Sequence, residues 1–312
     1  MRPPPPPRSR VTRFFFGHIG ILISIIVYVV TAGGAGFSIE GVTRALWTAL
    51  GVQTVYLLIA WGLSEHKQFD LTVWALYAVG TAAALAGIEP VLRLYQQYFG
   101  VLLFTSFAIT AVVPLLLGRE PFTVWHAVRQ APRWQHDTPA FEVSNRVISG
   151  FWAVLFLIAA ALCAARPTDP MFTVVYPNLV MVFGLVSPRW LLPLWFKRFP
   201  APLPDRAEPL IMGMPFAFDS RAAGDARALI QFRVSGEPGG TYYVRVAGGR
   251  CESFEGEAGS PDLTVHVPDE VWVRIVRGEL DGGQALMDRH YSAEGDFTLL
   301  AKLQTWFPAR GA

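Results

Sequence analysis

Long apolar runs dominate the first two thirds of the chain, and short alternating patterns dominate the last third. Six runs approach the roughly 20 apolar residues that a helix needs to cross a bilayer. Proline residues interrupt the last of them, so that helix is kinked, short or partly interfacial. The pattern predicts an all-α domain of about six transmembrane helices over residues 14–198, with the apolar runs at 14–32, 45–63, 71–88, 99–117, 147–165 and 171–194.

The last third of the chain shows strand and helix periodicities in alternation. Apolar and polar residues alternate over 229–235 and 263–267, and a Gly-Gly turn joins the segments 242–247 and 250–256 into a hairpin. A last short strand is expected around 291–294. Helices are expected after Pro268, over 284–289, and after Asp296, which would cap the closing helix. This pattern predicts a small α+β domain.

Composition supports this division. The chain is 52% hydrophobic and 16% charged, whereas an ordinary soluble protein carries about 25% charged residues. This composition argues against a wholly soluble protein. Residues 1–204 hold 15 Lys and Arg against 8 Asp and Glu, and the remainder holds 11 against 16. A basic membrane half thus precedes an acidic soluble half.

The basic residues also predict an orientation. With the N-terminus inside, twelve Lys and Arg fall on the inner side of the six runs and three on the outer side. Positive charge concentrates on the cytoplasmic side of membrane proteins, so we expect both termini to be cytoplasmic. Frequent Ala, Gly, Arg and Pro favour a bacterial source, and hence the inner (plasma) membrane.

Two proline-rich segments complete the expected domain organisation. Residues 1–13 form a basic, proline-rich cytoplasmic tail, and residues 199–211 form a linker that its prolines hold extended. The soluble domain then covers 212–312. The loop 119–146 mixes Arg, Trp and Phe, which suits the surface of an anionic bilayer. Its positive charge also makes it a possible intramolecular docking site for the acidic residues 212–312.

The soluble domain resembles the sterol carrier protein 2 (SCP2) family of lipid-binding domains over residues 212–307. The matching segments are MPFAFD at 214–219, ALIQFRVSGE at 228–237, TYYVRVAGGRCESFEGE at 241–257, PDLTVHVPDEVWVRIVRGEL at 261–280 and ALMDRHYSAEGDFTLLAKLQTWF at 285–307. The resemblance implies a five-stranded sheet with helices that enclose a hydrophobic tunnel for sterols, fatty-acyl lipids or phospholipids. It implies neither a metal nor a catalytic residue. The membrane half loosely resembles uncharacterised bacterial inner-membrane proteins.

The expected ligand site is an apolar pocket in this domain. A cavity with apolar walls is what a lipid tail needs, and the same side chains serve equally well as plain core. The candidate pocket residues are Phe232, Val234, Tyr242, Val244, Val265, Trp272, Ile275, Val276, Met287, Leu300, Leu303 and Phe307.

No motif points to covalent chemistry. Cys163 and Cys251 lie in different halves without metal-ligand spacing, so we expect no metal, no cofactor and no nucleic-acid partner. His126, His136 and Asp137 form a candidate acid–base set, and no nucleophile or metal-ligand spacing accompanies them in the sequence. We therefore expect a membrane-tethered protein that binds and locally presents or senses a lipid at the cytoplasmic leaflet, and that is not an enzyme. Two alternatives stay open: an interaction or regulatory module without a ligand, and a lipid-modifying enzyme that uses the domain to hold substrate.

Overall fold

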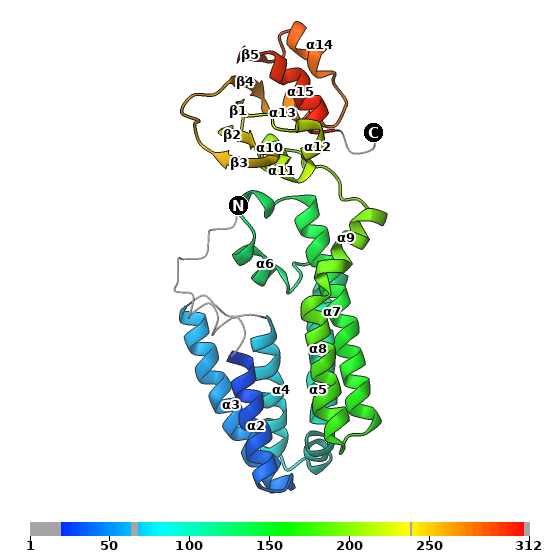
Figure 1. Ribbon diagram of the computed structural model, residues 1–312. Helices are drawn as coiled ribbons and strands as arrows, with labels where there is room; N and C mark the ends of the chain where they lie inside the picture. Colours follow the sequence, from blue (N-terminus) through cyan, green and yellow to red (C-terminus); the bar gives the residue numbers. More distant parts are fainter. Residues whose placement is uncertain (1–19, 64–67, 238, 309–312) are drawn as a thin grey trace. The chain divides into compact units, whose positions relative to one another are not determined.

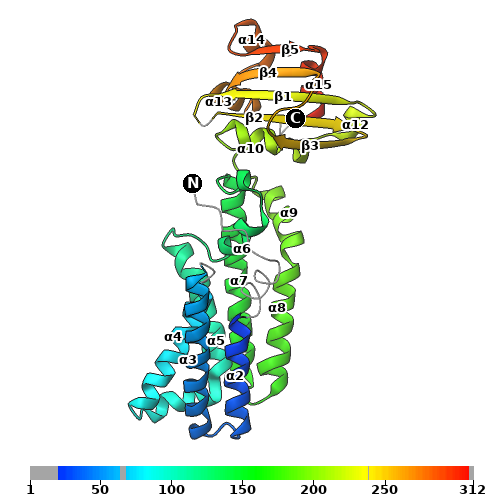
Figure 2. The ribbon, with the colours of Figure 1, turned by 90° about the vertical axis from the view of Figure 1, so that its left-hand side faces the viewer.

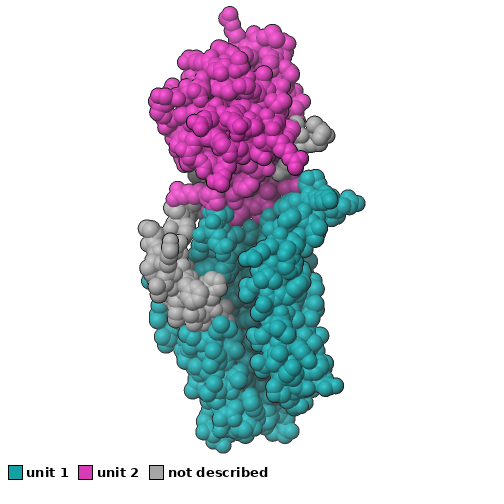
Figure 3. All heavy atoms as spheres, in the orientation of Figure 1, with its two compact units in different colours: residues 1–131, 143–200 teal, residues 132–142, 201–312 magenta. Residues whose placement is uncertain are grey.

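The chain forms two compact units in the computed structural model, which describes residues 20–63, 68–237 and 239–308. One unit comprises residues 1–131 and 143–200, and the other comprises 132–142 and 201–312 (Figure 3). The expected tail 1–13 and the start of the first apolar run lie outside the described residues.

Four helices of the first unit pack into a bundle around aromatic side chains (Figure 1). The core of the bundle contains Tyr28, Tyr77 and Tyr95, and the Tyr28 hydroxyl donates to the Tyr95 carbonyl over 3.0 Å. Tyr28 also stacks on Phe99, with 3.9 Å between ring centroids. Every buried hydroxyl that finds a partner in this way removes a cost of placing polar atoms in an apolar interior. The helices are α2 (Gly20–Gly34), α3 (Ile39–Gly62), α4 (Gln68–Leu85) and α5 (Glu89–Leu116).

The rest of the first unit contains a long helix and a bent one. Gly184 lies on α8, and a Cβ at this position would come within 2.7 Å of Trp152 and Leu155. The absence of a side chain therefore lets α8 pack closely against α7. The elements are α6 (Val124–Gln130), η2 (Arg133–Gln135, assigned to the second unit), α7 (Pro139–Ala165), η3 (Met171–Val175), α8 (Tyr176–Val186) and α9 (Pro188–Arg198).

Three helices of the described residues are long and apolar enough to cross a membrane, namely α3, α5 and α7. The segment from Met171 to Arg198 makes a fourth if it is one span, and it bends by 54° at its break. The sixth apolar run was expected to be kinked, short or partly interfacial because of its prolines. The bend matches the first of these expectations. The apolar part of α2, Leu22–Gly34, is shorter. A helical N-terminal region is thus confirmed, whereas six complete spans stay a prediction.

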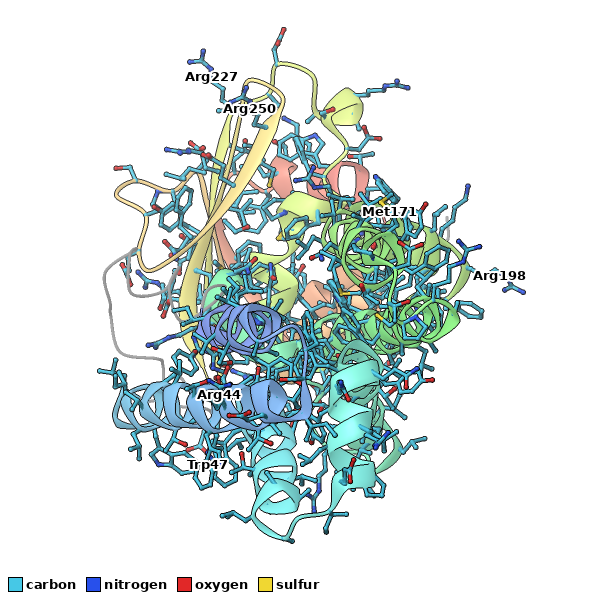
Figure 4. The ribbon with its side chains drawn as sticks, turned by 90° about the horizontal axis from the view of Figure 1, so that it is seen from below. Arg44, Trp47, Met171, Arg198, Arg227 and Arg250 are labelled. Carbon is cyan, nitrogen blue, oxygen red and sulfur yellow. The ribbon has the colours of Figure 1, made fainter. Side chains whose placement is uncertain are left out.

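The helices of the first unit expose many large apolar side chains. Trp47 on α3 and Met171 on η3 are 47% and 45% exposed, and both are labelled among the side chains that surround the helices in Figure 4. Leu58, Leu116 and Leu185 are more exposed still. Contiguous apolar surface of this kind is rare on soluble proteins and marks contact with lipid or protein.

The second unit is built on a five-stranded mixed sheet in the order β3-β2-β1-β4-β5 (Figure 2). β1 pairs with β2 antiparallel and with β4 parallel, so the connection from β3 crosses over to the far side of β1. This confirms the expected α+β domain and its five strands. The strands are β1 (Ala228–Ser235), β2 (Gly240–Ala247), β3 (Arg250–Glu255), β4 (Leu263–Pro268) and β5 (Ser292–Gly295).

Helices supply the rest of the core against one face of the sheet. The first of them, α10, includes Ala207 and Ile211, which are fully buried. Residues 207–211 were expected to belong to an extended linker, yet they form part of the domain. The helices are α10 (Ala207–Met212), α11 (Met214–Ala217), α12 (Ser220–Ala223), α13 (Asp269–Val276), α14 (Gly282–Met287) and α15 (Thr298–Trp306).

Asp296, the expected cap of the closing helix, lies two residues before the start of α15 and binds its first residue, while Phe297 occupies the N-cap position. Its Oδ1 atom accepts hydrogen bonds from the Thr298 backbone N–H over 2.9 Å and from the Thr298 hydroxyl over 2.6 Å. Both bonds favour the ionised carboxylate and lower the pKa of Asp296 below its usual value.

Candidate functional site

The candidate site is the apolar interior between the sheet and its helices. Alternate residues of β1 point into it. The strand pairing places other residues beside them: Phe232 pairs with Tyr242 on β2 and with Val265 on β4. Because side chains alternate along a strand, these pairs and those two residues away lie on one face. Ile230 and Phe232 at the centre are fully buried.

Nine of the twelve candidate pocket residues meet in this interior. The strand residues are buried core, and the helix residues are partly buried against it. Ile275 and Val276 are partly buried but outside this cluster, and Met287 is 76% exposed. The nine are Phe232, Val234, Tyr242, Val244, Val265, Trp272, Leu300, Leu303 and Phe307.

Sequence reasoning missed several residues of the same interior. Ile211 and Met214 come from the segment before the first strand, and Leu299 and Trp306 come from the closing helix. The apolar stripe of the closing helix carried a signal for the last two. Nothing in the proline-rich segment signalled the first two.

Two helices with partly buried side chains close the interior. Trp272 of α13 lies edge-on to Phe232, with 4.9 Å between ring centroids. The ring centroid of Phe307, just after α15, lies 5.6 Å from that of Phe218. Leu300 and Leu303 of α15 are also only partly buried. These helices therefore contribute partly buried side chains beside buried ones such as Leu299 and Trp306, whereas the candidate residues on the strands are all buried.

Polar groups border the interior where α10 and α13 begin. The Ala207 N–H donates to Asp269 Oδ1 over 2.9 Å, and Arg206 pairs with Glu208 over 2.9 Å. Burial, with further contributions from Glu208 and other nearby carboxylates, raises the pKa of Tyr242 to about 12. Its phenol is therefore neutral at physiological pH.

Two N–H groups in this region are buried without an acceptor among the residues that the structure describes. They are the indole Nε1–H of Trp272 and the Nε–H of Arg206. An unpaired buried donor costs about 1–3 kcal/mol, so each is an exception that calls for an explanation.

The outer face of the sheet is polar and partly covered by a loop. Gln231 is 1% exposed, and its Nε2 donates to the carbonyls of Tyr242 and Gly256 over 2.7 and 3.2 Å. Its Oε1 accepts from the Ala258 N–H over 2.6 Å. One glutamine thereby holds the β3–β4 loop on the sheet.

An open hollow of about 360 Å³ lies at the end of β1, where Arg233, Thr241 and His266 are among the lining residues. Arg233 pairs with Glu257 over 3.2 Å. Arg227 and Arg250 are labelled near one another at the opposite end of the strands (Figure 4). Arg233 is thus paired with a carboxylate, whereas Arg250 is exposed to solvent.

The chemistry of the described residues is that of packing and hydrogen bonding. Among residues 20–63, 68–237 and 239–308, no group of three His, Cys, Asp or Glu could hold a metal ion. His126 falls in the first unit and His136 in the second. Cys163 is buried and Cys251 is partly buried.

Comparison with known proteins identifies the family of the C-terminal domain. Residues 219–308 match the model of the SCP-2 sterol transfer family. No curated protein matches the chain.

Three solved structures show the range of similarity. The crystal structure of sterol carrier protein 2 like 2 from Aedes aegypti is 26% identical, with a TM-score of 0.26, over 30% of this chain and 86% of that one. The solution structure of the palmitated Aedes aegypti protein is also 26% identical, with a TM-score of 0.26, over 30% and 84%. A possible sterol carrier protein from Thermus thermophilus is 21% identical, with a TM-score of 0.25, over 31% and 77%. The chain therefore carries an SCP-2 sterol transfer family domain at residues 219–308, and this domain suggests lipid binding.

Proposed function

We propose that this protein binds a hydrophobic lipid in the interior of its C-terminal domain, non-covalently and without enzymatic catalysis. The observation that carries the proposal is the apolar interior of an SCP2 fold, in which several of the helix side chains, such as Trp272, Leu300 and Leu303, are only partly buried. A lipid enters by displacing α13 and α15 from the sheet, so that its chain takes the place of their apolar side chains in the core.

The helical half tethers this domain to a membrane. Support comes from three helices that are long and apolar enough to span and from the exposed leucines on them. The excess of Lys and Arg on one side favours cytoplasmic termini, and the composition favours a bacterial inner membrane. The bound lipid is then presented or sensed at the cytoplasmic leaflet. A lipid-modifying enzyme finds less support, because the sequence shows no nucleophile motif or metal-ligand spacing to accompany the acid–base candidates His126 and His136.

The test is native mass spectrometry of the fragment 201–312, whose core residues all lie between 207 and 307. We expect an added mass of a few hundred daltons that disappears on denaturation. Leu303→Trp enlarges a partly buried side chain of α15 and should reduce lipid occupancy about tenfold or more, since overpacking costs about 1–3 kcal/mol. Gln304→Trp, at an exposed position of the same helix, is the matched control and should keep the lipid.

A fragment that carries no mass and ignores added sterols, fatty acids and phospholipids would contradict lipid binding. The domain would then be an interaction or regulatory module, which is the second candidate function.

We further propose that the domain docks on the segment 132–142 of the basic loop. Support comes from the grouping of this segment with residues 201–312 and from the 6.3 Å between the ring centroids of Trp134 and Phe216. Phe216 remains 77% exposed with Trp134 beside it, so the tryptophan covers only a small part of its apolar surface.

Hydrogen exchange of the full chain in nanodiscs checks the docking. Trp134→Ala should speed exchange of the amides around Phe216 by about two- to tenfold, because an aromatic pair contributes about 0.5–1.5 kcal/mol. Trp190→Ala removes an exposed tryptophan of α9 and should leave these amides unchanged. Equal exchange in both variants would exclude the docking.

A further inference from the structure

Helix α9 has an apolar surface that the rest of its unit leaves open. It reads PRWLLPLWFKR, and none of its eleven residues is buried by the part of the chain that the structure describes. Trp190 is 51% exposed and Leu194 is 67% exposed. A helix of this length is unstable by itself in water, and its apolar side chains therefore need a further surface to pack on.

The break before α9 turns this helix away from the direction of a span. The segment Met171–Val186, which forms η3 and α8, has sixteen residues. Such a segment rises about 24 Å, whereas the hydrocarbon core of a bilayer is about 30 Å thick. α9 then leaves at an angle of 54°. With α8 as the last span, α9 begins near the boundary of the core and runs obliquely at the level of the headgroups.

The basic side chains of α9 carry uncompensated charge. Arg189, Lys197 and Arg198 are exposed, and none of the described carboxylates pairs with them. Arg198 instead lies over the ring of Phe199, 5.2 Å from its centroid, and its labelled side chain points away from the helices (Figure 4). Other exposed arginines of this unit each pair with a carboxylate three or four residues away, namely Arg44, Arg93 and Arg166.

The two kinds of side chain lie on different faces of α9. Successive residues of an α-helix are about 100° apart, which places Leu191 and Trp195 on one face. Arg189 and Lys197 fall on the opposite face. Tryptophan is enriched at the boundary between hydrocarbon and water, and long basic side chains extend from an apolar level to reach the headgroups. This arrangement is typical of a helix that lies in the membrane interface.

We propose that α9 lies in the headgroup region of the bilayer and binds anionic phospholipids, whose phosphates contact Arg189, Lys197 and Arg198. This inference rests on the proposed membrane tether and names the class of lipid that its last helix binds. The bilayer covers the exposed tryptophans and leucines and supplies the opposite charge. The binding is electrostatic, so it selects negative charge rather than one headgroup structure.

The test is hydrogen exchange of the full chain, resolved by peptide, in two kinds of nanodisc. One contains phosphatidylcholine alone, and the other contains phosphatidylcholine with phosphatidylglycerol, which is anionic. We expect the amides of α9 to exchange more slowly in the anionic nanodiscs, whereas those of α3 should exchange at the same rate in both. High salt should remove the difference, because it screens exposed charges.

Two double variants separate this charge from positive charge in general. Arg189→Gln with Lys197→Gln should make α9 exchange about thirtyfold faster than wild type in the anionic nanodiscs, which corresponds to about 2 kcal/mol for two cations. It should change little in phosphatidylcholine. Arg44→Gln with Arg93→Gln removes the same charge from exposed arginines of the same unit and should leave α9 unchanged in both.

Each other result overturns a different part of the proposal. If α9 exchanges equally slowly in both nanodiscs, binding of anionic lipid is excluded, although the helix lies on the membrane. If α9 exchanges fast in both, the helix lies off the membrane, and a protein partner is the alternative cover. If α3, α5 and α7 also exchange fast, the proposed tether itself fails. The comparison of wild-type protein in the two nanodiscs decides these questions without any variant.

Discussion

Replacing Gly295 with alanine should lower the free energy of unfolding of the C-terminal domain by about 3 kcal/mol or more. Gly295 has φ +105°, a region that residues with side chains avoid. A Cβ here would also collide with the carbonyl oxygen of Asp262, in the backbone that leads into β4. Neither strand can yield without breaking the pairing of Gly295 with Leu263.

The measurement is thermal or urea unfolding of the fragment 201–312, together with hydrogen exchange of residues 293–296. Strain and overpacking each cost about 1–3 kcal/mol, so β5 should lose its protection first. Gly259→Ala is the control, because a Cβ at Gly259 meets no atom within 4 Å. Equal stability of the two variants would show that the end of β5 tolerates a side chain.

Replacing Gln231 with leucine should cost about 3 kcal/mol. The leucine is apolar and similar in size, yet it leaves the Ala258 N–H and the Gly256 carbonyl without their partner. Buried groups that lose a partner cost about 1–3 kcal/mol each. The β3–β4 loop should leave the sheet, and the strands beneath it should open more often.

Cys251 provides the readout in the full chain. Burial raises the pKa of its thiol to about 12, so the reactive thiolate is scarce until the domain opens. In a Cys163→Ala background, Gln231→Leu should increase labelling of Cys251 by a thiol reagent about a hundredfold, the factor that about 3 kcal/mol gives. Gln284→Leu alters an exposed glutamine on α14 and should change the rate little. Equal rates in the two variants would mean that Gln231 does not hold the loop.

The strands of the domain could be predicted because their signal is local. Ile230, Phe232 and Val234 alternate with polar residues, and this alternation survives in the buried face of β1. The hairpin followed from Gly248 and Gly249, both of which have positive φ. Asp296 likewise accepts a hydrogen bond from the backbone N–H of Thr298, the first residue of its helix and only two positions further along the chain.

The remaining features depend on contacts between distant segments. Pro209 suggested an extended linker, but it lies in the first turn of α10, where proline costs no hydrogen bond. Gln231 looked like a solvent-facing strand residue, and only the returning β3–β4 loop buries it. Whether the indole N–H of Trp272 finds an acceptor depends on all the atoms that surround it in the fold, so no pattern along the chain could reveal it.

The membrane half shows a different limit. Hydropathy marks apolar runs, but it does not fix where each helix ends. The run expected to end at 88 corresponds to α4, which ends at Leu85, and α5 already begins at Glu89, ten residues before its expected apolar run. Polar residues such as Glu89 and Arg93, which pair over 2.6 Å, extend helices beyond the apolar windows.

Because α10 belongs to the domain, the linker that joins the domain to the helical half is short. Only residues 199–206 remain between the end of α9 and the start of α10, and such a segment reaches about 30 Å at most when fully extended. With the helical half in a bilayer, the domain can sample only a shell about as deep as the hydrocarbon core of that bilayer is thick. If the helical half is the membrane anchor proposed above, the domain would meet its own leaflet at a high effective concentration and would not carry a lipid to a distant membrane. Its working range would then be one patch of one membrane.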